Sequence, residues 1–321
     1  MKTKKGGNII TTTKINTVKS KERIKLEDLA MPFMCYDLVM KAIFIDDVNI
    51  LAKMVADITG IDYKVLENNT ILETNEIPIN NLNEKSKRCD FVLRINKDRI
   101  INLELNASYY PGLIIKNLSY LFGIFSNATK KSEEYNENLI TTQVNLNCYD
   151  KNTDEALEQY QLQEVNSHKL YTKNITIFNL NVVKCLELYY NLDNLDNVPK
   201  HIKWGALIYN RDLSKIPNIV EEIMTIEERN RIMSKIDKLT KDDKFMSELE
   251  AIKMLEWEEK SKMTYVKNLG IAEGRAEGEI KGKEETTKEL ILSMLDNNAT
   301  LEFISKVTNK SIDEIQKIIN Q

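Results

Sequence analysis

Two short stretches, residues 88–95 and 100–106, alternate apolar and polar positions as strands with one buried face do. Only a short polar turn separates them, which predicts a β-hairpin. In the second stretch Ile101, Leu103 and Leu105 would occupy one sheet face. Glu104 and Asn106 lie two residues apart and would therefore project together from the opposite face.

The hydrophobic pattern of this hairpin also limits its register. Phe91 must pack with the apolar face, so it opposes Leu103 or Leu105, and Asp90 then opposes Glu104 or Asn106. Two carboxylates in such proximity repel one another unless a cation lies between them, and a hard divalent metal ion suits oxygen ligands. The alternative is an exposed hairpin face that carries ordinary polar residues.

The surrounding pattern predicts an α/β domain. Apolar residues recur at three- and four-residue steps over 36–59, which indicates a helix that ends at Gly60. A strand is expected over 71–79, then the hairpin, then a helix that Pro111 opens and that runs to about residue 127. A strand follows over 139–148. The order helix, three strands, helix, strand favours a parallel crossover.

The second half is expected to be mostly helical. A strand over 175–180 follows a polar insert, helix or loop, at 150–173. Short helices are expected over 186–190 and 202–209, and a long helix over 224–263, where charged residues alternate with apolar ones.

Four glycines, Gly270, Gly274, Gly278 and Gly282, then recur at four-residue spacing. If helical, they share one face. The alternatives are a flexible tether and a long marginal helix that orders on a partner, and we favour the helix, with a second copy of the chain as a possible partner.

Residues 287–321 predict a small helical module. Ser311 and Glu314 form a capping-box pattern that starts the last helix, after a turn at Thr308–Lys310. The arrangement is similar to a helix-turn-helix, but the last helix opens with two acids. A helical hairpin for protein contacts is therefore as well supported as DNA-groove recognition.

Composition excludes several function classes. The 321 residues carry a net charge of −4, so bulk basicity gives no argument for nucleic-acid binding. The chain has four widely spaced cysteines and two histidines, which argues against a zinc ribbon and histidine-dependent nucleases. No phosphate-binding glycine loop and no membrane-length apolar stretch occurs. Reduced thiols in a cytoplasmic protein are the simple expectation.

Basic residues are concentrated in two segments, the first 25 residues and the surroundings of the hairpin. Residues 1–25 contain eight Lys or Arg and one Glu, which predicts a disordered arm over 1–30 that is either solvated or tracks phosphates. Near the hairpin, basic side chains either line a nucleic-acid site or are ordinary turn charges; they are Lys85, Lys87, Arg88, Arg94, Lys97, Arg99 and Lys116.

At this point the chain resembles a family. The segment 36–44, Asp90, the run Glu104–Asn106, the helix segment 116–120 and the strand end at Cys148–Tyr149 are similar to motifs of the PD-(D/E)XK nuclease family transposases, also called recombination-promoting nucleases. The resemblance covers residues 31–285. It implies a restriction-endonuclease-like domain over 31–215, followed by the charged helical segment with glycine repeats over 216–286. The small module over 287–321 is expected from its own sequence pattern.

The resemblance implies a metal-dependent DNA endonuclease, associated with recombination or mobile elements. Asp90 and Glu104 would bind Mg²⁺ or Mn²⁺, and the carbonyl of Leu105 could complete the metal shell. Asn106 replaces the family's lysine or glutamine; an amide cannot act as a general base but can orient a water. The alternative function is a catalytically inactive domain that binds DNA or protein and assembles through its tail.

Two more residues are candidates for the site. Lys116, early in the helix after the hairpin, could reach back and supply the cation that Asn106 lacks, or it could be a solvated helix lysine. Asp37 could complete the metal site, or it could simply stabilise the start of its helix. Asp46 and Asp47 are expected to be surface charges.

Overall fold

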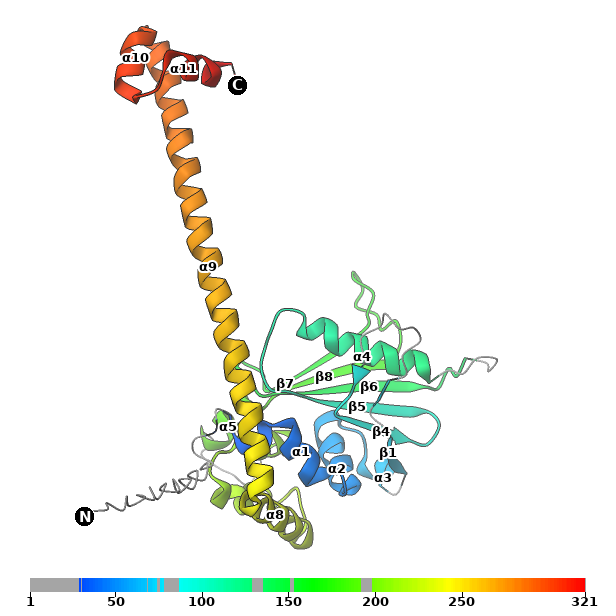
Figure 1. The fold of residues 1–321 in the computed structure, drawn as a ribbon. Coiled ribbons are helices and arrows are strands. Elements are labelled where there is room, and N and C mark those ends of the chain that lie inside the picture. The colour runs from blue at the N-terminus through cyan, green and yellow to red at the C-terminus, as the bar shows by residue number, and fades with distance from the viewer. Residues whose placement is uncertain are drawn as a thin grey trace, which may run out of the picture. The chain divides into compact units, whose positions relative to one another are not determined.

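The computed structural model describes residues 29, 31–67, 69–73, 76–77, 87–128, 135–150, 153–191 and 198–320. Of the expected arm over 1–30, only Leu29 belongs to this part of the chain. Pro78 and Lys85 also lie outside it. The chain divides into two compact units, Met1–Glu250 and Ala251–Gln321. Figure 1 gives the elements of both.

The first unit combines helices with a mixed sheet. Its helices are η2 (Phe33–Cys35), α1 (Asp37–Phe44), α2 (Val48–Thr59), α3 (Tyr63–Leu66), α4 (Leu113–Asn127), α5 (Val182–Asn191), α6 (Lys200–Tyr209), η4 (Leu213–Lys215), α7 (Ile216–Ile219) and α8 (Ile226–Lys241). Its strands are β1 (Thr70–Glu73), β2 (Glu76–Ile77), β3 (Lys87–Arg88), β4 (Phe91–Ile95), β5 (Arg99–Asn106), β6 (Ile140–Asn147), β7 (Leu157–Gln161) and β8 (Ile175–Asn181).

Six strands form one sheet in the order β1-β4-β5-β6-β8-β7, and β2 pairs with β3 separately. β4 and β5 pair antiparallel with Phe91 opposite Leu103, which confirms one of the two predicted registers. β5 and β6 pair parallel across the α4 crossover, as predicted. The α/β class and the mostly helical C-terminal region are thus confirmed.

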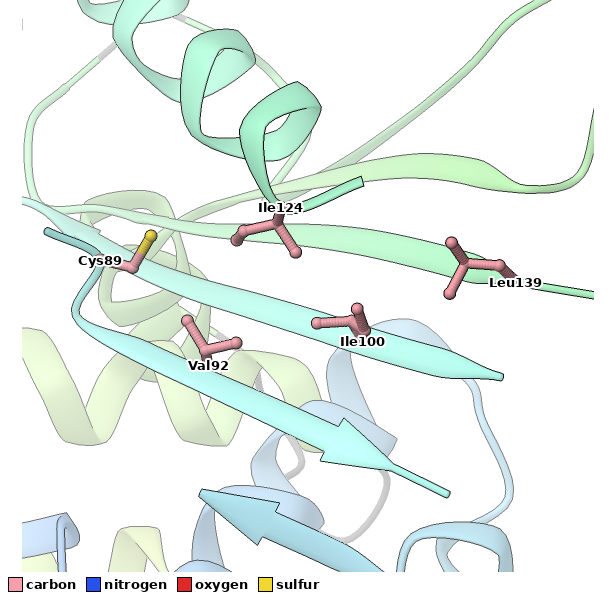
Figure 2. Close-up of a cluster of buried hydrophobic side chains, with 5 residues drawn as sticks. All are labelled: Cys89, Val92, Ile100, Ile124 and Leu139. Carbon is pink, nitrogen blue, oxygen red and sulfur yellow. The ribbon is translucent and has the colours of Figure 1, made fainter. Parts of the chain in front are cut away.

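Helices cover both faces of this sheet (Figure 1). α4 packs on β5 and β6, whereas α2, α5 and α6 pack against β8. On the α4 side an apolar cluster joins the hairpin to α4 and β6 (Figure 2); it consists of Cys89, Val92, Ile100, Ile124 and Leu139. Burial of both faces fixes the central strands in place, and the polar residues among them are buried too.

Several sequence predictions need correction. The long helix expected over 224–263 is divided, since α8 ends at Lys241 and the next helix begins at Asp243. The strand expected over 71–79 is also divided, into β1 and β2, which belong to different sheets. The expected helix over 36–59 is broken between α1 and α2, and Asp47 at the break is 12% exposed because it pairs with Arg231 and Lys235 of α8. Pro111 precedes the helix rather than opening it, since α4 begins after Gly112. The insert over 150–173 contains β7, an edge strand that pairs with β8.

The close contact of α5 and α6 depends on Gly205. A Cβ atom built at this glycine would lie 2.4 Å from Cβ of Cys185, so only glycine fits at this crossing. Gly60 ends α2 in the left-handed conformation, as predicted. All four cysteines are free and buried: Cys35, Cys89, Cys148 and Cys185.

The second unit is helical. Helix α9 (Asp243–Asp296) begins in the first unit and continues through the four spaced glycines, as the helical alternative predicted. Ile291 of α9 packs with Ile304 of α10 (Leu301–Thr308) and Ile315 of α11 (Ile312–Ile319). The predicted capping box of Ser311 and Glu314 is present. No helix in the described ranges is both long and apolar enough to span a membrane.

Candidate functional site

Glu104 lies at the centre of the polar face that α4 covers. The β5 residues on this face, Asn102, Glu104 and Asn106, are all buried, and Glu104 has no exposed surface. The alternative of an ordinary exposed hairpin face is therefore wrong. Oε1 of Glu104 accepts hydrogen bonds from the backbone N–H of Asp90 and from Nδ2 of Asn102, each at 3.2 Å.

Asp90 lies next to Glu104, as the predicted register requires, but it lies just outside the β4–β5 ladder. It lies in a bend before β4, so its side chain does not follow the strand alternation that places Glu104. The ladder ends at Phe91, and Oδ2 of Asp90 accepts the backbone N–H of Leu105 at 2.8 Å. The carboxylate thus takes the place of a main-chain acceptor at the end of β4.

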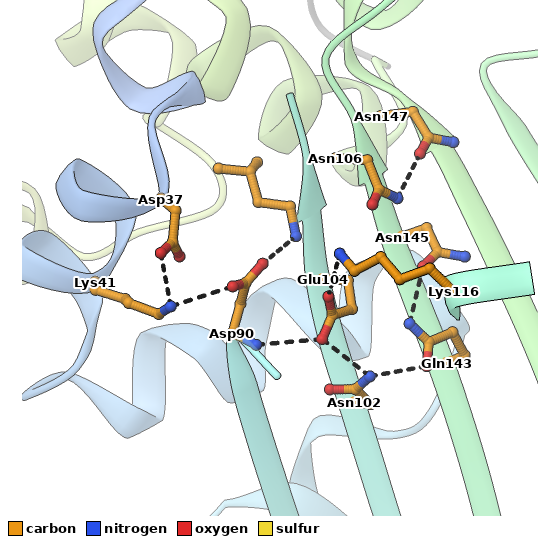
Figure 3. A network of polar contacts seen from close by, with 11 residues as sticks. Asp37, Lys41, Asp90, Asn102, Glu104, Asn106, Lys116, Gln143, Asn145 and Asn147 are labelled. Carbon is orange, nitrogen blue, oxygen red and sulfur yellow. Dashed lines mark hydrogen bonds and ion pairs between the residues drawn. The ribbon is translucent and has the colours of Figure 1, made fainter. Parts of the chain in front are cut away.

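Each carboxylate has its own lysine (Figure 3). Nζ of Lys116 on α4 lies 3.2 Å from Oε2 of Glu104. Nζ of Lys41 on α1 lies 3.2 Å from Oδ1 of Asp90 and 2.7 Å from Oδ2 of Asp37. The prediction that Lys116 reaches back to the hairpin is confirmed, although its chemical role stays a prediction.

Burial raises the pKa of both acids, and the charge of Glu104 adds to the rise for Asp90. Burial, the charge of Glu104 and then that of Asp37 raise the pKa of Asp90 to about 7. Burial also raises the pKa of Glu104, although Lys116 and the hydrogen bonds to Glu104 oppose the rise. Both carboxylates therefore hold protons more tightly than exposed acids do, and a nearby cation would release those protons.

The two lysines remain charged. Burial alone would lower the pKa of Lys116, but attraction to Glu104 and the hydrogen bond between them outweigh it, and the pKa is raised. The pKa of Lys41 is raised too, because the hydrogen bond to Asp37 and the charge of Asp90 outweigh its burial. Both side chains are cations at neutral pH and supply charge rather than a basic nitrogen.

A row of carboxamides continues from Glu104 across the sheet (Figure 3). Nδ2 of Asn102 donates to Oε1 of Gln143 at 2.9 Å, and Nε2 of Gln143 donates to Oδ1 of Asn145 at 2.8 Å. Nδ2 of Asn145 then donates to Oδ1 of Asn179, also at 2.8 Å. Buried polar groups need such partners, and each amide of the row hydrogen-bonds to its neighbour.

Asn106 forms a second, shorter pair. Its Nδ2 donates to Oδ1 of Asn147 at 3.0 Å, whereas its own Oδ1 is buried with no hydrogen-bond partner. Oδ1 of Asn102 is also buried and unpartnered. Unsatisfied oxygens are costly, so each can accept a hydrogen bond from a water or, less strongly, offer a ligand to a cation.

The structure therefore brings together most of the predicted site residues. Asp90, Glu104 and Lys116 converge. Asn106 lies two residues beyond Glu104 on β5. Asp37 is linked to Asp90 through Lys41, which pairs with both acids. The basic residues predicted near the hairpin are less concentrated. Arg94 pairs with Glu73, and Arg99 begins β5 five residues from Glu104, about 17 Å along an extended strand.

Lys41 and the amide row were missed by the sequence reasoning. The sequence held a signal for each. Asp37 and Lys41 are four residues apart and so share one helix face. Gln143, Asn145 and Asn147 alternate with Val144 and Leu146, so they share one face of a strand whose apolar residues are also buried.

The comparisons with known proteins add no relative. No family model, no curated protein and no solved structure matches the chain. Within the described ranges, no group of three or more His, Cys, Asp or Glu side chains is arranged to hold a metal ion. Any metal held here would depend on two carboxylates with amide and backbone oxygens.

Proposed function

We propose that the protein is a metal-dependent DNA endonuclease that hydrolyses phosphodiester bonds at the Asp90–Glu104 site. The observation that carries the proposal is the convergence of two buried carboxylates, Asp90 and Glu104, whose pKa values are raised chiefly by burial. The element order α1–α2, β1, β4, β5, α4, β6 also agrees with the restriction-endonuclease-like core that the sequence resemblance implies.

The donor chemistry fits Mg²⁺ or Mn²⁺. Carboxylate and amide oxygens are hard ligands, and Asn106 adds a buried oxygen that has no partner. Asp90 and Glu104 would hold the ion, and the carbonyl of Leu105 is a further candidate ligand. When bound, the ion supplies Lewis-acid polarisation of the phosphate and lowers the pKa of the attacking water.

The chain's own residues have distinct roles in this proposal. Lys116 stays protonated and offsets negative charge that develops on the phosphate. Asn106 orients the attacking water by a hydrogen bond, since an amide has no useful basicity. Lys41 and the N–H of Leu105 hold the Asp90 carboxylate in position. Asp37 acts through Lys41 as a positioning residue.

The first test is plasmid nicking by the full chain with Mg²⁺, comparing wild type with Asp90→Asn and Glu104→Gln. Each change preserves shape but removes a carboxylate charge. We expect nicking to fall at least about a thousandfold, because several kcal/mol of charge stabilisation are lost. The matched control is Glu187→Gln on α5, where the carboxylate is 55% exposed. Equal nicking by all four proteins would refute the assignment.

One observation favours a second candidate, a catalytically inactive domain that binds DNA or protein. Both carboxylates already have a lysine partner, so the site is largely charge-balanced without a metal ion. Calorimetric titration separates the two functions. The nuclease proposal expects saturable Mg²⁺ or Mn²⁺ binding that Glu104→Gln weakens; a folded protein that binds neither ion supports the inactive domain.

A further inference from the structure

A cavity of about 240 Å³ lies beside the carboxylate site, between α4 and the part of the sheet that β6 and β8 form. The candidate chemistry above does not use it. Its volume is smaller than the roughly 300–1,000 Å³ of pockets for drug-sized ligands. The cavity therefore suits one small ring system rather than a whole nucleotide.

The floor of the cavity is the amide row, and its hydrogen-bond direction is fixed from one end. Amide orientation is normally ambiguous, but a carboxylate can only accept, so Asn102 must turn its amino group toward Glu104. Gln143 and Asn145 then follow in the same direction. The row ends at Asn179, whose oxygen is already occupied by Asn145. The amino group of Asn179 is what remains to donate to a ligand.

Two further asparagines give the cavity a mixed polar edge. Oδ1 of Asn147 is occupied by Asn106, so its amino group is a second donor. Asn117 on α4 also lines the cavity; it is 9% exposed, and its Oδ1 is buried with no partner. A ligand that both accepts and donates hydrogen bonds would satisfy these groups together.

The walls are aromatic and apolar. The rings of Tyr109 and Tyr149 lie 5.7 Å apart and tilted, and Leu113 and Leu118 of α4 lie opposite the amides. Burial, Tyr109 and Glu158 together raise the pKa of Tyr149 to about 12, so its phenol stays neutral. The residues that line the cavity carry no formal charge. A neutral planar ring fits these walls better than a phosphate does.

We propose that this cavity receives one unpaired nucleobase of the nucleic-acid strand that the carboxylate site acts on. The inference deepens the proposed function and rests on its nucleic-acid substrate. Glu104, Asn145 and Asn179 are aligned in register across three adjacent strands, so the two cavity asparagines lie about 5 and about 10 Å from Glu104 across the sheet. Stacking on tyrosine and pairing of a base edge with amides is how proteins hold extruded bases.

The test is binding by the full wild-type chain in EDTA, where cleavage does not interfere. Fluorescence anisotropy compares a short single-stranded DNA with the same strand made abasic, and with an RNA of equal sequence to distinguish the two sources of base. We expect the strand with bases to bind about tenfold or more tightly than the abasic one, because base stacking is lost in the latter.

Substitutions of two cavity residues test whether the base binds in the cavity. Asn117→Leu replaces an unpartnered acceptor by an apolar group of similar size, so the fold is retained, which circular dichroism checks. It should weaken binding of the base-bearing strand about tenfold and leave the abasic strand unchanged. Tyr149 is half-buried, and Tyr149→Leu should likewise weaken binding of the base-bearing strand. The control is Tyr171→Leu, where the ring is 83% exposed and outside the cavity.

Equal affinity for abasic and base-bearing strands, or no binding to any strand, would overturn the inference, as would wild-type base discrimination in both cavity variants. Failure of this inference can be distinguished from failure of the proposed function. Base discrimination in EDTA with no metal-dependent nicking leaves the cavity assignment standing and removes the endonuclease. Metal-dependent nicking that requires Glu104, without base discrimination, does the opposite.

Discussion

Two halves of one buried sheet face provide partners for their buried polar groups in different ways. Around β4 and β5, Asp90 and Glu104 are ionisable acids that pair with lysines from two helices. Across β6 and β8, neutral amides satisfy one another along the sheet. A buried charge needs a compensating charge, whereas a buried amide needs only a neighbour. The charged half should therefore respond to pH and to a cation, and the amide half to neither.

The largest expected effect is a pH dependence confined to the charged half. The folded protein holds a proton on Asp90 up to about pH 7, whereas the unfolded chain releases it near pH 4. Folding thus takes up a proton in this window. The contribution of Asp90 to the stability of the metal-free protein should therefore be largest below about pH 4 and fall as pH rises to about 7, by at most about 4 kcal/mol.

Urea unfolding in EDTA at several pH values measures this effect. Asp90→Asn should have a flatter profile between about pH 4 and pH 7, and the difference from wild type isolates Asp90 from acids such as Glu228, whose pKa is lowered. Parallel profiles for the two proteins would show that Asp90 titrates normally.

The next effect is the loss of one lysine. Lys116→Met should destabilise the protein by about 2–3 kcal/mol at pH 8, because it leaves Glu104 buried without its cation. The value lies below that of a fully buried pair since Lys116 is 31% exposed. Adding Glu104→Gln should restore most of the loss. A double variant as unstable as Lys116→Met would mean that packing, not charge, is responsible.

The smallest effect belongs to the amide half. Asn145→Leu should cost about 2 kcal/mol at every pH, since it leaves the donor of Gln143 and the acceptor of Asn179 unpartnered. The control Asn49→Leu, at an exposed position of α2, should change stability by less than about 0.5 kcal/mol. Thermal unfolding at two pH values checks both magnitude and pH independence; a marked pH dependence for Asn145→Leu would end the comparison.

The sequence predicted the parts of the fold that depend on hydrophobic alternation. The register of Phe91 with Leu103, the parallel crossover through α4 and the position of β8 all follow from which apolar residues must be buried. β7 was missed because residues 157–161 are only partly buried or exposed and give no such signal. The break before Val48 was missed because it depends on α8, nearly two hundred residues away.

The candidate site was predictable only in part, for a related reason. Glu104 follows from strand alternation, but Asp90 leaves the ladder, and nothing local in the sequence marks that bend. Burial of Asn102 and Gln143 was hidden because polar alternation normally indicates a solvated face. These two residues are buried because α4 packs its apolar side on the sheet and covers them.

The four buried cysteines have a practical consequence. Burial raises the pKa of Cys89, Cys148 and Cys185, so their sulfur atoms stay protonated and shielded from alkylating reagents while the chain is folded. Cys89 adjoins Asp90, whereas Cys185 lies where α5 crosses α6. The order in which iodoacetamide labels these thiols thus records which part of the first unit opens first, without any engineered probe.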